Sequence, residues 1–137
     1  MTKIQVMIID DSAMVRQVLT QILDSDPQIE VIATAIDPIV AASKLLAIKP
    51  DVIILDIEMP RMDGITFLKK LMAQHPLRVI ICSSLAQSGS SSAITAMRCG
   101  AVDIISKPVI GTKQFFEESK INICDAVKAA AYAKIRQ

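Results

Sequence analysis

Five side chains suited to metal or phosphate chemistry stand directly after apolar segments of the sequence: Asp10, Asp11, Asp56, Ser83 and Lys107. Carboxylates that are packed together repel one another and raise at least one pKa unless a cation neutralises them. Magnesium suits such a cluster, because it prefers oxygen ligands and is commonly held by one or two carboxylates plus a phosphate oxygen. We therefore expect Mg²⁺ at the three aspartates. Zinc fits less well, because no Cys or His ligands accompany them.

The lysine and the serine extend this chemistry to a phosphoryl group. Lys107 supplies a positive charge for a phosphoryl or carboxylate oxygen, and Ser83 supplies a hydroxyl that can donate to the same oxygen. A lone aspartate after a strand is more often a turn or capping residue, so the argument requires all five side chains to meet. The sequence has no glycine-rich phosphate loop after its first apolar segment, which argues against a bound nucleotide.

The segments that must position these side chains alternate regularly between two patterns. Apolar runs rich in β-branched residues predict five strands, at Ile4 to Ile9, Val31 to Ile36, Val52 to Leu55, Arg78 to Cys82 and Val102 to Ser106. Helical spacing of apolar residues predicts five helices, at Met14 to Leu23, Pro38 to about Ile48, Ile65 to Gln74, Ile94 to Cys99 and Thr112 toward Ala133.

This alternation predicts an α/β fold with a single doubly wound, five-stranded parallel sheet and helices on both faces. The favoured topology is the flavodoxin-like strand order 2-1-3-4-5. In such a sheet, functional groups gather beyond the carboxyl ends of the strands, which is where the five side chains fall.

Composition excludes several classes of protein. The chain has 137 residues, 52% of them hydrophobic and 21% charged, which indicates one soluble domain. A formal net charge of +1 argues against direct nucleic-acid binding. The longest uncharged stretch, Val79 to Met97, is interrupted by polar residues, so we expect no membrane insertion and a cytoplasmic location. The three cysteines are widely spaced, which predicts free thiols, and the one histidine, His75, is expected at the surface.

Four segments of the chain closely resemble the receiver domain of two-component response regulators. They are Met7 to Ser12 (MIIDDS), Ile53 to Gly64 (IILDIEMPRMDG), Val79 to Leu85 (VIICSSL) and Gly100 to Pro108 (GAVDIISKP). Within that superfamily, DDSAMVR, SSL and GAVDIISKP look most like the N-terminal receiver of the chemotaxis protein-glutamate methylesterase.

The resemblance implies a role for each candidate residue. Asp56 would accept a phosphoryl group from a phosphohistidine on a chemotaxis-type sensor histidine kinase, Lys107 would contact that group, and Ser83 would move to hydrogen-bond it. Such a carboxylate nucleophile is an established form of covalent catalysis. The magnesium ligands implied are the side chains of Asp10, Asp11 and Asp56 and the main-chain carbonyl of Glu58.

Three local features bear on this comparison. Receivers commonly carry an aromatic switch residue three positions before the lysine, where this chain has Ile104. An aliphatic residue cannot make the same hydrogen-bond change, so we expect coupling mainly through Ser83. Leu85, two residues after Ser83, could shield the phosphoryl group from water and slow its loss. The resemblance also implies a cis peptide bond before Pro108.

The resemblance divides the chain into a receiver at 1–125 and, at 126–137, either the end of the last helix or the start of a linker. A methylesterase output domain would be absent from this sequence, which has neither the length nor a suitably placed histidine for a Ser-His-Asp triad. The chain itself is then expected to catalyse only its own phosphorylation and dephosphorylation.

Two alternative functions and one question of assembly stay open. A stand-alone receiver would act by binding a partner surface. A small magnesium-dependent phosphohydrolase with an aspartate nucleophile is less well supported. Such enzymes place the nucleophile after the first strand, here Asp10, and a second acid two residues later, where this chain has Ser12. Weak homodimerisation is also left open.

Overall fold

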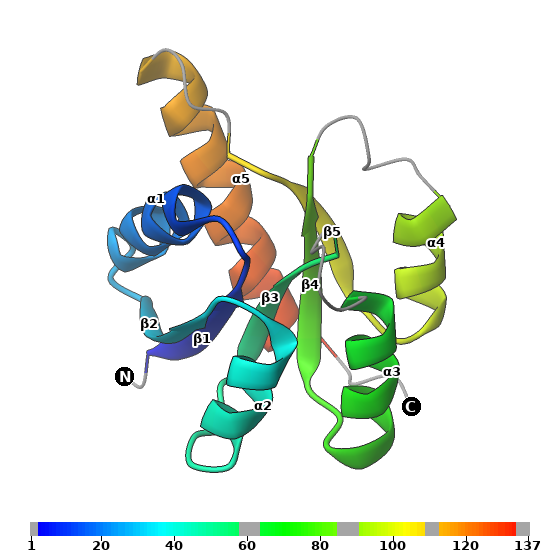
Figure 1. Ribbon diagram of the computed structural model, residues 1–137. Coiled ribbons are helices and arrows are strands. Elements are labelled where there is room, and N and C mark those ends of the chain that lie inside the picture. Colours follow the sequence, from blue (N-terminus) through cyan, green and yellow to red (C-terminus); the bar gives the residue numbers. More distant parts are fainter. Residues whose placement is uncertain (1–2, 58–63, 85–90, 109–112, 134–137) are drawn as a thin grey trace.

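The protein is built around a five-stranded parallel sheet (Figure 1). The computed structural model describes residues 3–57, 64–84, 91–108 and 113–133. The strands are β1 (Ile4–Ile9), β2 (Ile29–Ala35), β3 (Val52–Asp56), β4 (Arg78–Ser83) and β5 (Asp103–Ser106). Their order in the sheet is β2-β1-β3-β4-β5 and every neighbouring pair is parallel, which confirms the predicted topology.

Helices cover both faces of this sheet, as predicted. They are α1 (Ala13–Asp24), α2 (Pro38–Leu45), α3 (Gly64–Gln74), α4 (Ser91–Arg98) and α5 (Lys113–Ala131). Helices α1 and α5 lie on one face, and α2, α3 and α4 lie on the other (Figure 1). The three layers therefore form two cores, one on each side of the sheet.

The central strands are apolar because both of their faces are covered. In β1, Val6 and Ile8 belong to the core beneath α1 and α5, whereas Met7 and Ile9 belong to the core beneath α2, α3 and α4. All four side chains are fully buried. Alternate residues of a strand point to opposite faces, so a run without polar interruption is the pattern expected of a strand buried on both sides.

Side chains cap the first two helices at the edge where the candidate residues gather. The Ser12 side chain accepts a hydrogen bond from the Val15 N–H at the start of α1. The Asp37 side chain accepts one from the Val40 N–H, and Pro38 occupies the first turn of α2. These contacts satisfy amide groups that the first helical turn leaves unpaired. The cap at Ser12 begins α1 immediately after the first pair of acids.

The largest difference between the expected and observed strand bounds is at β2, whereas β3, β4 and β5 differ from their expected bounds by one residue each. β2 begins two residues before its predicted start, and it contains a bulge opposite β1. Val6 pairs with Val31 whereas Met7 pairs with Ala33, so Ile32 is an extra residue in the ladder. The exposed, charged Glu30 separates Ile29 from the apolar run that begins at Val31, so the apolar pattern alone placed the start of this strand too late.

Three helices differ from their expected bounds by more than one residue, since α4 spans Ser91–Arg98 rather than Ile94 to Cys99, and α2 and α5 end early. α2 ends at Leu45 rather than near Ile48, because the chain tightens there and the Leu46 N–H donates to the Ser43 carbonyl three residues back. α5 runs without interruption to Ala131, two residues short of Ala133. The spacing of apolar residues is the same whether or not the last turn of a helix frays, so this spacing does not predict where the helix ends.

The expectations for cysteine and histidine agree with the structure. All three cysteines are free: Cys82 and Cys124 are buried and Cys99 is half-buried. His75 is exposed just beyond the end of α3. Among the described residues, no helix combines the length and apolar character needed to cross a lipid bilayer.

Candidate phosphoryl and metal site

The candidate residues lie at the carboxyl edge of the sheet, at the ends of four neighbouring strands. Asp10 directly follows β1, Asp56 is the last residue of β3, Ser83 is the last residue of β4, and Lys107 directly follows β5. Parallel strands bring their carboxyl ends to the same edge, which explains how residues almost a hundred positions apart become neighbours.

Three carboxylates form a cluster at this edge. One carboxylate oxygen from each of Asp10, Asp11 and Asp56 lies within 4.8 Å of the other two. Asp10 and Asp56 are 1% and 0% exposed, whereas Asp11 is exposed. The cluster therefore has two acids in its interior and one at its mouth. The sequence predicted this convergence but not which of the two adjacent aspartates would be buried.

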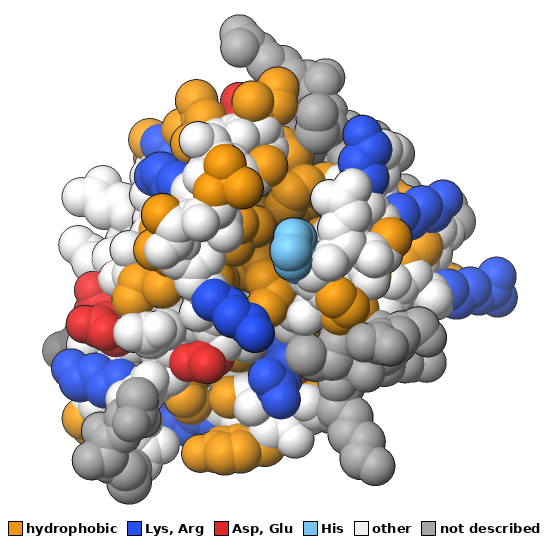
Figure 2. All heavy atoms as spheres, turned by 90° about the horizontal axis from the view of Figure 1, so that it is seen from below, with side chains coloured by type: hydrophobic (Ala, Val, Ile, Leu, Met, Phe, Trp, Pro, Cys, Tyr) orange, Lys and Arg blue, Asp and Glu red, His pale blue; other side chains and the backbone are white. Residues whose placement is uncertain are grey.

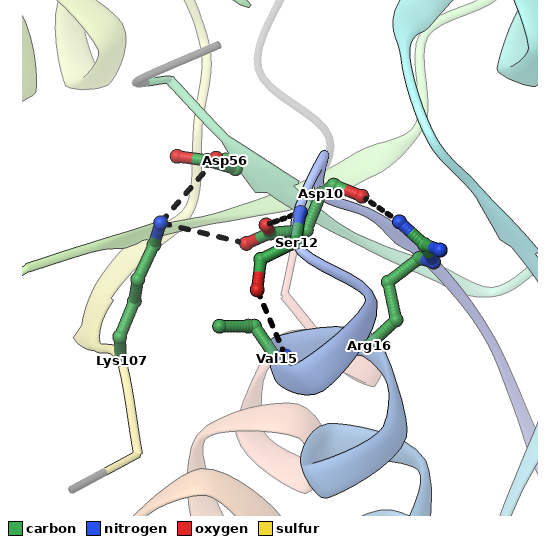
Figure 3. A network of polar contacts seen from close by, with 6 residues as sticks. All are labelled: Asp10, Ser12, Val15, Arg16, Asp56 and Lys107. Carbon is green, nitrogen blue, oxygen red and sulfur yellow. Dashed lines mark hydrogen bonds and ion pairs between the residues drawn. The ribbon is translucent and has the colours of Figure 1, made fainter.

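Asp10 is held rigidly by the start of α1. Its Oδ1 accepts a hydrogen bond from the Ser12 N–H at 2.8 Å, and its main-chain carbonyl accepts one from the Arg16 guanidinium at 2.8 Å (Figure 3). Burial raises the pKa of the Asp10 carboxyl, although the Ser12 N–H and the Lys107 ammonium act in the opposite direction. The negative charge of Asp11 raises it further.

Lys107 lies between the two buried acids. Its Nζ is 3.4 Å from Oδ2 of Asp56 and 3.6 Å from Oδ2 of Asp10 (Figure 3). The lysine side chain is 20% exposed, so the ion pairs with the two buried acids are largely shielded from solvent. The Lys107–Pro108 peptide bond is trans, because the described residues contain no cis bond, so the expectation of a cis bond here is wrong.

Ser83 lies beside this cluster on the neighbouring strand. Its main-chain carbonyl accepts a hydrogen bond from the Lys107 N–H at 2.7 Å, which joins the ends of β4 and β5. The side chain is fully buried, and its Oγ has no hydrogen-bond partner among the described residues. A buried hydroxyl without a partner is costly, which indicates a position kept for a ligand or a changed state.

Gly64 is a residue of this site that the sequence analysis did not single out. A Cβ atom there would lie 2.9 Å from the Asp56 carbonyl oxygen and 2.9 Å from the Ile57 Cα. The start of α3 therefore packs directly on the main chain that follows Asp56. The glycine at the end of the IILDIEMPRMDG segment could have indicated a close backbone contact. Only the folded structure shows that the contact is with the main chain of Asp56 and Ile57.

Two residues that the sequence analysis singled out, Glu58 as a carbonyl ligand and Leu85 as a shield, lie outside the described residues. Ile104 is half-buried in β5 and packs against the core beneath α2, α3 and α4.

The donor set fits a small, hard cation. It offers carboxylate oxygens from three residues, and Oδ2 of Asp10 is buried without a hydrogen-bond partner among the described residues. Oxygen ligands at this density suit divalent cations that prefer oxygen and would relieve the repulsion between the acids. The lysine alone contributes one positive charge against three negative charges.

Comparison with protein families and curated proteins adds independent information. The family model described as the response regulator receiver domain matches residues 6–118. The chain is 61% identical over 137 residues to protein-glutamate methylesterase/protein-glutamine glutaminase 3 of Geobacter metallireducens, covering 100% of this chain and 39% of that protein. It is 62% identical to a protein of the same name from Leptospira interrogans, covering 97% of this chain and 38% of that protein. The chain thus spans less than two fifths of the length of these relatives.

Solved structures show the same similarity in three dimensions. The response regulator domain of Thermotoga maritima CheB has a TM-score of 0.84 and 40% identity, and the match covers 96% of this chain and 98% of that one. CheY6 of R. sphaeroides, in a complex with the P1 domain of CheA3, has a TM-score of 0.75 and 35% identity over 94% of this chain and 99% of the matched chain.

Proposed function

Because this chain belongs to the response regulator receiver domain family, we propose that its Asp56 carboxylate accepts a phosphoryl group from the phosphohistidine of a histidine kinase. The observation that carries the proposal is the position of Asp56. Its side chain is fully buried at the carboxyl edge of the sheet, with the Lys107 ammonium 3.4 Å from Oδ2 and a second buried acid alongside.

The transfer exchanges one bond to phosphorus for another. An oxygen of Asp56 attacks the phosphorus, the nitrogen–phosphorus bond of the phosphohistidine breaks, and the imidazole leaves with the bonding electron pair. The product is an acyl phosphate on Asp56. Reactions of this kind need mainly positioning and charge neutralisation, because the phosphoryl group carries its own electrophilic centre. The Lys107 ammonium supports the ionised, nucleophilic form of Asp56.

The three carboxylates are proposed to hold Mg²⁺. The protein ligands would be Asp10, Asp11 and Asp56, with the main-chain carbonyl of Glu58, a residue outside the described part of the chain. A bound magnesium ion supplies charge neutralisation for the phosphoryl oxygens during transfer. The Ser12 N–H keeps one Asp10 oxygen fixed, so that the other remains directed at the cluster.

Lys107 and Ser83 are proposed to respond to the new charge. A phosphoryl group adds about −1.5 to −2 charge near neutral pH and three strong acceptor oxygens. Lys107 pairs with one of these oxygens, and the Ser83 hydroxyl turns to donate to another. Because Ser83 is the last residue of β4, its movement pulls on the chain that leads to α4. Ile104 cannot exchange hydrogen bonds, so the coupling runs mainly through Ser83.

The wider partners are proposed from the relatives. A chemotaxis-type histidine kinase is the phosphodonor and a methylesterase domain is the output, with residues 1–125 acting as the receiver and 126–137 leading toward that domain. The similarity to protein-glutamate methylesterases supports the output, and the complex of CheY6 with the P1 domain of CheA3 supports the donor. The chain itself is not proposed to hydrolyse esters.

Intact mass spectrometry tests the central step. Wild type, Asp56→Asn and a matched surface control, Asp125→Asn, are incubated with magnesium and acetyl phosphate. We expect wild type and the control to gain one phosphoryl mass, Asp56→Asn to gain none, and a chelator to abolish the gain. A phosphoryl mass on Asp56→Asn would identify a different nucleophile, and a gain that persists in chelator would remove the role of magnesium.

A further inference from the structure

A second hollow lies at the end of the molecule opposite the phosphoryl site. It is a groove of about 520 Å³ between the carboxyl-terminal ends of α2 and α3, near the start of β4 (Figure 2). α2 packs mainly on β2 and α3 packs beside α4, so the ends of these two helices leave space between them. None of the proposed phosphoryl-transfer residues lines this groove.

The inner surface of the groove is hydrophobic. Phe67 and Leu71 on α3 and Leu77 before β4 each belong to the core but retain 7% exposure. Leu46 stands at the mouth with 90% of its surface in water, although it is a large apolar side chain. An apolar floor that continues to an exposed apolar residue is typical of a site that binds a hydrophobic group.

The rim of the groove is polar and positively charged. Lys49 and Lys70 both line it and are exposed, and His75 lies beside them with a ring that can donate a hydrogen bond. No lining residue described by the structure carries a carboxylate. Figure 2 shows the single histidine, in pale blue, next to the orange hollow on this face. The groove therefore complements a ligand with an apolar body and a negatively charged end.

We propose that this groove binds a small anionic amphiphile, a free carboxylic acid with an apolar chain. The chain lies on Phe67, Leu71 and Leu77, and the carboxylate faces Lys49 and Lys70. The volume falls within the range of about 300 to 1,000 Å³ found for small-molecule sites. A partner helix would instead need anchoring pockets spread over several turns. This binding is independent of the phosphoryl chemistry proposed above.

Nuclear magnetic resonance with octanoate as the probe tests the site. We expect saturable amide shifts confined to the ends of α2 and α3 and the residues leading into β4. Ala42→Phe places a ring in the groove from an exposed alanine that lines it, and should weaken octanoate binding about tenfold or more. The matched control Ala73→Phe, on an exposed α3 position outside the groove, should leave binding unchanged. Thermal melting verifies that both variants fold.

A second set of variants tests the charged end. The double variant Lys49→Gln with Lys70→Gln should weaken octanoate binding about threefold or more, whereas Lys69→Gln should not. Neutral 1-octanol should bind more weakly than octanoate to wild type, and it should bind equally to wild type and to the lysine variants. Asp56→Asn should bind octanoate like wild type, which separates this site from phosphorylation.

Four results would overturn the inference. They are shifts scattered over the whole surface, undiminished binding by Ala42→Phe, equal affinity for octanoate and 1-octanol, and no saturable octanoate binding. If an acidic amphipathic peptide bound where octanoate did not, the groove would be a protein docking site and the proposal would be wrong.

Discussion

The Lys107 ammonium lies 3.4 Å from Oδ2 of Asp56 and only slightly farther, at 3.6 Å, from Oδ2 of Asp10. One cation is thus shared by two acids that are almost completely buried. This arrangement places a positive charge beside the nucleophile before any metal or phosphoryl group is bound. It also places the lysine in competition with a metal ion for the same carboxylates, because like charges repel across short distances.

Replacing Lys107 should slow phosphoryl transfer without weakening the binding of Mg²⁺. In Lys107→Gln the cluster loses a positive charge, so Mg²⁺ should bind at least as tightly as in wild type. Phosphorylation by acetyl phosphate should nevertheless slow about 100-fold, because a charge that stabilises the transferring group is gone. The rate of mass gain across a magnesium series measures both effects, with Lys69→Gln as the surface control. Weaker magnesium binding in Lys107→Gln would contradict this assignment.

Removing the Ser83 hydroxyl should slow phosphoryl transfer without lowering the stability of the fold. The hydroxyl is fully buried without a hydrogen-bond partner among the described residues, so Ser83→Ala should leave the free energy of unfolding unchanged or raise it by about 1 kcal/mol. Phosphorylation should slow about tenfold, the equivalent of one lost hydrogen bond.

Urea unfolding and the rate of mass gain measure the two quantities. Ser106→Ala, which changes the serine paired with Ser83 on β5, is the matched control and should phosphorylate normally. A Ser83→Ala protein that is clearly destabilised would mean that the hydroxyl already has a structural partner.

Most of the fold follows from local patterns in the sequence. Val6 to Ile9 of β1 are all apolar because helices cover both faces of the strand, and Asp37 followed by Pro38 marks the start of α2 correctly. The start of β2 was missed because the exposed Glu30 interrupts the apolar pattern, and the bulge at Ile32 was not predicted because it depends on pairing with β1. Pairing between strands is a property of the folded chain and has no local signal.

The sequence predicted which side chains meet at this edge of the sheet, but not how each of them is oriented or buried. Strand ends predict that Asp10, Asp11, Asp56, Ser83 and Lys107 meet at one edge. Asp10, Asp56 and Ser83 contact the side chain or main chain of Lys107, and Asp11 belongs to the same carboxylate cluster. Which aspartate of the first pair is buried depends on how α1 begins, through the Ser12 N–H contact. The close approach of Gly64 likewise depends on how α3 packs, which spacing cannot reveal.

A side chain at Gly64 should disturb the nucleophile through the main chain. The atoms that a Cβ would meet, the Asp56 carbonyl oxygen and the Ile57 Cα, are backbone atoms that cannot rotate away. Gly64→Ala should therefore lower the free energy of unfolding by about 1–3 kcal/mol and slow phosphorylation of the folded protein.

Ala73→Gly is a control for stability alone. It should cost about 1 kcal/mol at an exposed position of the same helix without changing the phosphorylation rate. Equal phosphorylation rates for the two variants would show that Gly64 is needed for packing and not for positioning Asp56.

Far from the phosphoryl site, an ion pair joins α5 to the end of α1 and should contribute pH-dependent stability. Lys128 Nζ lies 2.6 Å from Oδ2 of Asp26, and the Cys124 thiol donates to the Ile22 carbonyl nearby. The hydrogen bond from Lys128 is the largest cause that lowers the pKa of Asp26 below its ordinary value of 3.8. A carboxyl whose pKa is lower in the folded state stabilises the fold above pH 3.8 and loses that contribution as pH falls through the lowered value.

The prediction concerns the difference in free energy of unfolding between wild type and Asp26→Asn. At neutral pH wild type should be more stable, and the difference should shrink as the pH falls below 3.8. Asparagine can still accept the hydrogen bond that the Gln28 N–H donates to this side chain, so the substitution removes mainly the charge. Urea unfolding over a pH series measures the difference, and Asp125→Asn, at an exposed α5 position, serves as the control. A difference that stays constant with pH would show that Asp26 acts through packing, since only an ionised carboxylate gains from the lysine.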